Sequence, residues 1–353
     1  MTAPKSGPAI ETIRLAPDYT ISRVIKGSWQ LSKGHSTVDH DQAVDDMATF
    51  VEAGVTAFDC ADIYTGVEEL IGTFRRRYPE LAAKTRVHTK FVPDDDALET
   101  LDRSYVTRII DRSLARLGQD RLDLVQFSWW RYEADRFVEV MGWLDDERRK
   151  GKIDLLGVTN FNTPALAKIL NAGIPVASNQ LQYSLLDDRP GRAMVALCRE
   201  HDVGLLTYGT LAGGFLSERW LGVPEPRGDF DNRSLIKYKL IIDDFGGWDL
   251  FQELLQTLDI IARRHDTTVA AVATRVMLDR PAVAACILGA RNTHHLPDTL
   301  RVFDLGLTAQ DTAELDAVTA RRQGPAGDVF DLERDRNGKH GRIMKYNLNR
   351  EAG

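Results

Sequence analysis

The sequence predicts an α/β protein built as a (β/α)8 barrel, the TIM-barrel fold. Eight short apolar runs each precede a longer segment with helical periodicity, a pattern typical of a parallel sheet covered by helices. The chain of 353 residues is long enough for one large barrel. The alternative is an open, doubly wound sheet, but no Gly-x-Gly-x-x-Gly run follows the first strand, as a dinucleotide-binding domain of that kind requires.

The first four strand-helix units follow one another closely. In the helix expected after the third strand, residues 105–118, five apolar side chains form one stripe: Val106, Ile109, Ile110, Leu114 and Leu117. Gly54 suits the end of the first helix. The expected strands span residues 23–29, 56–60, 86–92 and 121–128, and the expected helices span residues 39–54, 66–80, 105–118 and 136–151.

The second four units complete the count of eight. Pro164 suits the first turn of the fifth helix, because its missing N–H would have no partner there anyway. The expected strands span residues 153–160, 176–184, 204–210 and 283–290, and the expected helices span residues 163–173, 191–202, 249–265 and 293–303. Eight such units close most naturally into a barrel.

Two segments exceed a minimal barrel. Residues 211–249 form a long loop after strand seven, which we interpret as a lid over substrate or cofactor, with a packing excursion as the alternative. A polar tail follows Arg322 and is either an ordered arm packed on the barrel or a flexible end. We therefore divide the chain into a barrel, residues 1–322, and a C-terminal tail, residues 323–353.

Composition excludes several classes of protein. The formal net charge of −7 argues against a basic face for nucleic acid or anionic lipid. The N-terminus lacks a signal-peptide core, and no apolar run approaches the length of a membrane span, so we expect a cytoplasmic protein. Cys60, Cys198 and Cys286 lack metal-ligand spacing, and we predict buried free thiols and no metal site.

Three residues at the ends of strands two and three form a coherent chemical set: Asp59, Tyr64 and Lys90. An adjacent ammonium favours a phenolate and lowers the pKa of a tyrosine from its usual value of about 10. Asp59, if paired with Lys90, would orient it. The set predicts a proton donor and acceptor for reducing a carbonyl or oxidising an alcohol. The alternative is a structural ion pair with Tyr64 packed at a loop.

Other strand ends suit a flat cofactor that carries an amide. Asn160 and Gln180 offer donors and acceptors for a carboxamide, and Tyr208 offers a ring face for stacking. Arg291 lies near a predicted helix N-terminus, where backbone N–H groups and a guanidinium together could bind phosphate. Jointly they favour a nicotinamide nucleotide across the barrel mouth.

At this point the sequence resembles the aldo-keto reductases over about residues 20–320. The matching runs include "FDCADIYTGVEELIG", "HTKF", "GKIDLLGVTNF", "SNQLQYSLL", "YGTLAGGFL" and "ILGARNTHHLPDTL". The resemblance implies a barrel that binds NADP(H), less often NAD(H), without a Rossmann domain, and transfers a hydride to or from a carbonyl carbon.

The resemblance also implies roles for individual residues. Asp59, Tyr64 and Lys90 match three of the family's four catalytic residues, with Tyr64 as the acid-base group. The family's usual Asn is absent at Thr299. The implied cofactor contacts are Gly27 and Trp29 beside the first strand, Thr159, Asn160 and Gln180 at the carboxamide, Tyr208 as the stacking ring, and Gly289, Arg291, His295 and Asp298 at the adenosine phosphate.

The fourth catalytic residue of the family is a histidine, five residues after the aspartate of "LDL". Counting five from Asp123 reaches Ser128. A serine hydroxyl can donate one hydrogen bond but reaches less far than an imidazole and carries no charge. Three interpretations follow: a redox enzyme with room for a bulky or hydroxylated substrate, an altered or redox-neutral reaction, or a cofactor-binding sensor with slow turnover.

The substrate pocket is expected to be aromatic. Trp29, Trp129 and Trp130 would wall the mouth and suit sugar rings or aromatic aldehydes, although Trp129 and Trp130 could instead only cover the barrel rim. We expect Asp62 to solvate its loop. The sequence therefore predicts a cytoplasmic NADP(H)-dependent oxidoreductase acting on a small carbonyl compound (aldehyde, ketone or sugar) or its alcohol, and leaves its substrate and oligomeric state open.

Overall fold

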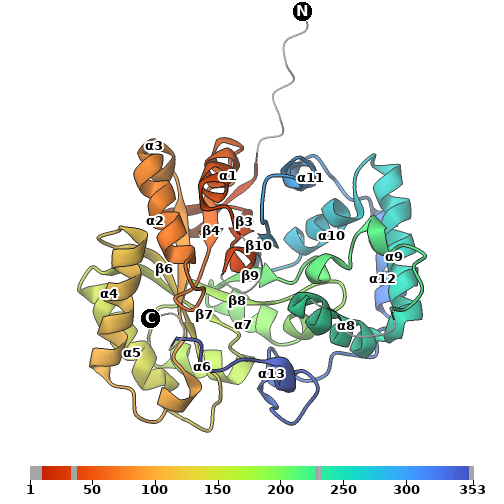
Figure 1. Ribbon diagram of the computed structural model, residues 1–353. Helices are drawn as coiled ribbons and strands as arrows, with labels where there is room; N and C mark the ends of the chain where they lie inside the picture. The colour runs from red at the N-terminus through yellow and green to blue at the C-terminus, as the bar shows by residue number, and fades with distance from the viewer. Residues whose placement is uncertain (1–9, 33–37, 227–229, 231, 350–353) are drawn as a thin grey trace, which may run out of the picture.

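The computed structural model describes residues 10–32, 38–226, 230 and 232–349, and its centre is the expected barrel (Figure 1). Eight parallel strands follow one another around it, and the last pairs with the first. They are β3 (Val24–Gly27), β4 (Ala57–Asp59), β5 (Arg86–Phe91), β6 (Leu122–Ser128), β7 (Ile153–Thr159), β8 (Ser178–Gln182), β9 (Gly204–Tyr208) and β10 (Val283–Gly289). The predicted fold class is confirmed.

Helices cover the outside of the barrel (Figure 1). Their ends follow local chemistry: Asp102 accepts a hydrogen bond of 2.9 Å from the backbone of Tyr105 at the start of α4, and Gly118 ends it with φ +62°. Those after the first six barrel strands are α1 (His40–Glu52), α2 (Val67–Arg77), α3 (Pro79–Ala82), α4 (Arg103–Leu117), α5 (Phe137–Arg149), α6 (Thr163–Asn171) and α7 (Met194–Glu200).

The pairing of the strands brings the polar strand ends level with one another. Gly27 of β3 pairs with Asp59 of β4 on one side and with Gly289 of β10 on the other. Ser128 pairs with Thr159 across β6 and β7. Because all eight strands are parallel, these residues share the C-terminal face of the barrel.

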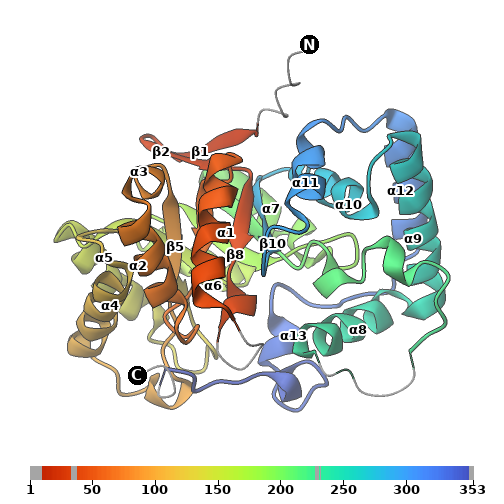
Figure 2. The same cartoon turned by 45° about the horizontal axis from the view of Figure 1, so that its top comes forward.

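A hairpin that we did not predict lies outside the barrel. β1 (Thr12–Ala16) and β2 (Tyr19–Ser22) pair antiparallel, and Figure 2 shows them at the opposite end of the molecule from the C-terminal helix α13 (Asp331–Arg334). Tyr19 and Ile21 are buried in the cluster that fills the barrel interior, so the hairpin closes the N-terminal end. Its signal was two short runs around Pro17–Asp18, a typical turn pair.

The segment after β9 is more helical than predicted. We expected residues 211–249 to be a loop, but they contain α8 (Arg233–Phe245). Its buried residues Tyr238, Ile241, Ile242 and Phe245 are spaced three and four apart, a helical pattern that the sequence already carried. The helices that follow α8 in the barrel are α9 (Gly247–Arg264), α10 (Val269–Leu278), α11 (Leu296–Leu300) and α12 (Ala309–Thr319).

The described part of the tail is an arm packed on the barrel. After α12 the backbone N–H of Gln323 donates to the carbonyl of Phe245 at 2.9 Å, and the chain then passes through α13 beside α8 (Figures 1 and 2). It ends against the loop after β5, where the N–H of Asn349 donates to Asp94 at 2.8 Å. The tail thus crosses the face that carries the strand ends.

The three cysteines lie in the interior without disulfide bonds, as the sequence predicted. Cys60, Cys198 and Cys286 are all buried and unpaired. Within the described ranges, no helix combines the length and apolarity that a membrane crossing requires.

Candidate active site

A buried ion pair occupies the centre of the C-terminal face. The Nζ atom of Lys90 lies 2.9 and 2.8 Å from the two carboxylate oxygens of Asp59, and 2.8 Å from the carbonyl of Cys60. Both charged side chains are about 5% exposed. Burial acts to lower the pKa of Lys90, but Asp59 and the neighbouring Tyr64 raise it overall, so the ammonium form is retained.

Tyr64 lies directly above this pair. The Lys90 ammonium is 5.1 Å from the centre of the Tyr64 ring, and the ring of Trp29 is 4.7 Å from that of Tyr64. Trp29 belongs to a short 3-10 helix rather than to the first strand, which ends at Gly27. The structure therefore brings together Asp59, Tyr64, Lys90 and Trp29, as the sequence predicted.

The expected effect of Lys90 on Tyr64 is outweighed. Burial raises the pKa of Tyr64 to about 12, while the nearby ammonium acts in the opposite direction. We expected a pKa below the usual value. The sequence could not weigh these two effects, because it does not state how deeply the phenol is buried.

Two glutamines complete the surroundings of Asp59. The side-chain amides of Gln180 and Gln126 donate to Oδ1 of Asp59 at 2.5 and 3.2 Å. Gln180 was expected to contact a carboxamide, and at least one of its amide hydrogens is instead used here. Gln126 was missed, although it stands two positions before Ser128 and so faces the same side of β6.

Ser128 ends β6 at the same level as Thr159, and both side chains are buried. A small hydroxyl therefore stands on the barrel face, close to the ring of polar strand ends. Its chemical role remains a prediction.

Asn160 and Tyr208 meet on the other side of the face. The Tyr208 hydroxyl donates to Oδ1 of Asn160 at 2.7 Å, and the backbone N–H of Asn160 donates to Gln180 at 2.8 Å. Asn160 has φ +61°, a left-handed conformation that asparagine tolerates better than most residues. Its Nδ2 has no partner in the part of the chain that the structure describes, so it is available to a ligand.

The segment after β10 presents its polar groups to solvent. Gly289, Arg291 and His295 are exposed, and Asp298 is half-buried in the first turn of α11. Arg291 has no carboxylate partner among the described residues. Since α11 is only five residues long, shorter than expected, any phosphate binding here would depend on Arg291 rather than on a helix dipole.

Trp129 and Trp130 are turned into the protein. They are 1% and 8% exposed, and their indole nitrogens each donate to a backbone carbonyl at 2.9 Å, those of Ala134 and Pro93. Trp130 also packs against Tyr346 of the tail at 5.2 Å. This packing favours the alternative that they cover the barrel rim, whereas Trp29 remains beside Tyr64.

The tail contributes groups that sequence reasoning missed. Arg334 donates to the carbonyls of Asn160 and Trp129 at 2.6 and 3.2 Å, and its guanidinium lies 4.3 Å from the centre of the Tyr132 ring. It therefore joins the tail to the ends of β6 and β7. Only its position in a charged tail was visible in the sequence, which gave no indication of this contact.

We expected Asp62 to solvate its loop, but the structure places it in the interior. It is fully buried, and its Oδ2 accepts hydrogen bonds from Asn349 at 3.0 Å and from the backbone of Val92 at 3.1 Å. Burial raises the pKa of Asp62 to about 7, although the hydrogen bond from Asn349 acts in the opposite direction. The tail is thus bonded to the loop that carries Tyr64.

A second buried charge cluster fixes the start of α13. Arg189 donates to Asp187 at 2.7 Å and to both oxygens of Glu333 at 2.9 and 3.0 Å, and all three side chains are almost fully buried. Arg189 lowers the pKa of Glu333 to about 2 against the effect of burial. The tail is therefore held beside β8 by an ionised pair.

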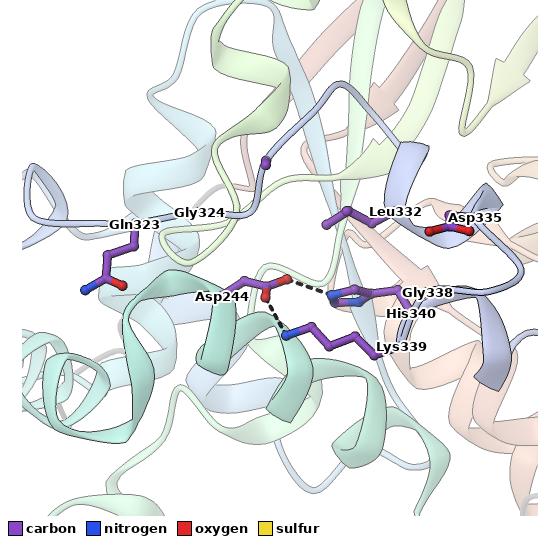
Figure 3. Close-up of a pocket in the computed structure, with 9 residues that line it drawn as sticks. Asp244, Gln323, Gly324, Leu332, Asp335, Gly338, Lys339 and His340 are labelled. Atoms are coloured by element: carbon purple, nitrogen blue, oxygen red, sulfur yellow. Dashed lines mark hydrogen bonds and ion pairs between the residues drawn. The ribbon is translucent and has the colours of Figure 1, made fainter.

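Two surface cavities lie along the tail rather than over Tyr64. One, of about 250 Å³, lies between α8 and the tail, where Asp244 accepts hydrogen bonds from Lys339 and His340 (Figure 3). The other, also about 250 Å³, lies beside Asn349 and Arg112. In the described ranges, no group of three or more His, Cys, Asp or Glu side chains is arranged to hold a metal ion.

Comparison with known proteins agrees with this geometry. The sequence profile of the "Aldo/keto reductase family" matches residues 23–320. A chloroplastic pyridoxal reductase of Arabidopsis thaliana is 27% identical over 326 residues, which cover 87% of this chain and 85% of that protein. Flagellar radial spoke protein 5 of Chlamydomonas reinhardtii is 28% identical over 257 residues, 62% of this chain, which spans about half (49%) of that relative.

A solved structure has the same fold. The glycerol dehydrogenase AKR11B4 from Gluconobacter oxydans aligns with a TM-score of 0.72 and 23% identity, covering 92% of this chain and 98% of the other.

Proposed function

Because the chain belongs to the aldo/keto reductase family, whose oxidoreductases act on carbonyls and alcohols, we propose that it is an NADP(H)-dependent oxidoreductase. Its substrate would be a small aldehyde, ketone or sugar, or the corresponding alcohol. The observation that carries the proposal is the Lys90 ammonium, held by Asp59 at 2.8 Å and placed 5.1 Å from the Tyr64 ring.

The residues on the barrel face fit a nicotinamide nucleotide. Asn160 keeps an unpartnered Nδ2 for a carboxamide, Tyr208 presents a partly exposed ring, and Arg291 is an exposed guanidinium without a carboxylate partner among the described residues. When bound, the nicotinamide would supply or accept the hydride. Arg291 supports NADP(H) over NAD(H), because a guanidinium matches the additional phosphate of the former.

Tyr64 would manage the proton. With a pKa of about 12, its hydroxyl is protonated at neutral pH and can donate to a carbonyl oxygen as negative charge develops there. Lys90 stabilises the phenolate that this transfer leaves, and Asp59 holds Lys90 in place. Oxidation of an alcohol would require the reverse transfer, in which the phenolate accepts the proton.

Ser128 would supply a hydrogen bond at the position where the family has histidine. A hydroxyl there leaves more room than an imidazole, which supports a bulky or hydroxylated substrate. The alternative is that the protein binds the nucleotide and performs a redox-neutral reaction or a sensing role.

Two measurements test the proposal. NADPH or NADP⁺ at millimolar concentration should raise the melting temperature, because a ligand that binds only the folded state stabilises it. Neither nucleotide raising it would overturn the cofactor assignment. A screen of carbonyls and sugar alcohols, followed at the nicotinamide absorbance, should then identify a substrate.

The proton assignment needs its own variant and control. Tyr64→Phe should lower kcat by about 100-fold or more, since it removes the acid-base group. Tyr78→Phe is the matched control, because the Tyr78 hydroxyl bonds Asp45 on the surface at 2.8 Å. Equal turnover by the wild type and Tyr64→Phe would exclude the mechanism.

A further inference from the structure

A lysine from α8 lies in a cage of three aromatic rings at the barrel mouth. The Nζ atom of Lys237 is 4.9 Å from the centre of the Tyr208 ring, 5.6 Å from that of Tyr238 and 6.0 Å from that of Phe330. The three rings come from β9, α8 and the residue before α13, and both views show α8 and α13 side by side (Figures 1 and 2). The cage exists only because the α8 insertion and the tail meet over β9.

The cage holds a cation without an adjacent anion. Lys237 makes no ion pair or hydrogen bond with any described side chain, and the nearby carboxylates of Asp187 and Glu333 are both bonded to Arg189. Burial lowers the pKa of Lys237, and Glu333 acts in the opposite direction. The faces of aromatic rings attract cations, so the rings stabilise the ammonium. At longer range the cluster of Asp187, Arg189 and Glu333, which has two carboxylates and one guanidinium, also stabilises it.

The position of this charge matters because of Tyr208. Resting on the proposed function, in which the nicotinamide stacks on Tyr208, the ring would lie within roughly 10 Å of Nζ of Lys237. An oxidised nicotinamide carries a positive charge, whereas a reduced one is neutral. A fixed ammonium at this distance repels the first and leaves the second almost unaffected.

We propose that Lys237 makes the site bind the reduced cofactor more tightly than the oxidised one. At an effective dielectric constant of about 20 to 40, two unit charges roughly 10 Å apart change a dissociation constant by about 5- to 15-fold. The α8 insertion then acts as an electrostatic selector of redox state, in addition to covering the barrel mouth.

The alternative is that the Lys237 ammonium binds an anion, such as a phosphate of the nucleotide. The two cases differ in their outcome. Both NADPH and NADP⁺ carry the phosphates. If Lys237 bound a phosphate, removing its charge would therefore weaken the binding of both nucleotides by the same factor. Repulsion of the nicotinamide ring, in contrast, affects the binding of NADP⁺ alone.

The test is a pair of binding constants, measured by calorimetric titration of the full chain with NADPH and with NADP⁺. Lys237→Met keeps the side-chain stem but removes the charge, and should tighten NADP⁺ about 5- to 15-fold while changing NADPH by less than about twofold. Lys237→Arg should keep the wild-type ratio. Lys239→Met is the matched control, because Lys239 on the same helix is paired with Glu225 and Asp243 at 2.7 and 2.6 Å.

The outcomes separate this inference from the proposed function. If the wild type binds neither nucleotide, the proposed function fails first. If both nucleotides bind and Lys237→Met changes them equally or not at all, only the role of Lys237 is overturned. A ratio that shifts in Lys239→Met as much as in Lys237→Met would also overturn it, since the effect would then be general to the charge of α8.

Discussion

Nδ2 of Asn349 donates a hydrogen bond of 3.0 Å to the buried carboxylate of Asp62. The contact joins the end of the described tail to the loop after β4, two positions before Tyr64. Oδ1 of the same carboxylate is buried and has no hydrogen-bond partner among the described residues. Because only one of its two buried oxygens is hydrogen-bonded to a described residue, the stability of the fold depends on whether Asp62 is protonated.

Asp62 should make stability depend on pH. Its pKa is about 7 in the folded protein, against 3.8 as the ordinary value, so the folded state binds more protons between those values. The free energy of unfolding therefore falls as pH rises from about 4 to about 7, and the loss is complete above that window. For this one group the loss is at most roughly 4 kcal/mol.

Urea unfolding of wild type and Asp62→Asn between pH 4 and 9 measures this effect. The amide cannot ionise, so the stability of Asp62→Asn relative to the wild type should increase through the window and level off above about pH 8. Asp120→Asn, at an exposed site, controls for the loss of one negative charge. A stability difference that is constant with pH would contradict the prediction.

Lys90→Met should destabilise the protein and abolish turnover together. It leaves the carboxylate of Asp59 buried without its cation, which costs about 3 to 5 kcal/mol in comparable pairs. In the double variant Asp59→Asn with Lys90→Met, no charge is buried, so most of the stability should return while turnover stays low. Recovery of turnover with stability would show that the pair is only structural.

Ser128→His should change which substrates are accepted. An imidazole adds a donor for the developing oxyanion but fills space, so we expect turnover of small aldehydes to rise about tenfold or more and that of the bulkiest substrate to fall. Ser128→Ala tests the hydroxyl itself. If Ser128→His raised turnover of every substrate, position 128 would be a degraded catalytic position. If neither the wild type nor Ser128→His turned over any substrate, the sensing alternative would be favoured.

Glu333→Gln should loosen the tail. Arg189 would lose one of its two buried carboxylate partners, at a cost of about 3 kcal/mol or more. We expect a lower melting temperature and faster proteolytic cleavage after residue 322. Glu253→Gln is the control, because its pair with Arg321 is about half exposed and should contribute less than about 1 kcal/mol.

Much of the barrel was predictable because its signals are local. The stripe in α4 and the alternation of strands and helices depend on neighbouring residues, and Asp59 and Lys90 were found because parallel strand ends meet at one face. The hairpin β1–β2 and helix α8 carried readable signals that we did not use. In both elements the signal lies in residues that are close together in the sequence.

The remaining features depend on contacts between distant parts of the chain. Nothing near Lys237 in the sequence indicates that Phe330 will cover it, and nothing near Asp62 indicates Asn349. The burial of Trp129 and the raised pKa of Tyr64 have the same origin, since both depend on how much of the fold covers each side chain.

The bond between Asp62 and Asn349 spans 287 positions of the chain, and this distance has a consequence for synthesis. A ribosome completes the loop that holds Tyr64 long before it adds residue 349. The loop that carries Tyr64 therefore gains this hydrogen bond only after residue 349 has been synthesised. A contact between positions so far apart forms slowly, because a long stretch of chain must be ordered before the two ends meet.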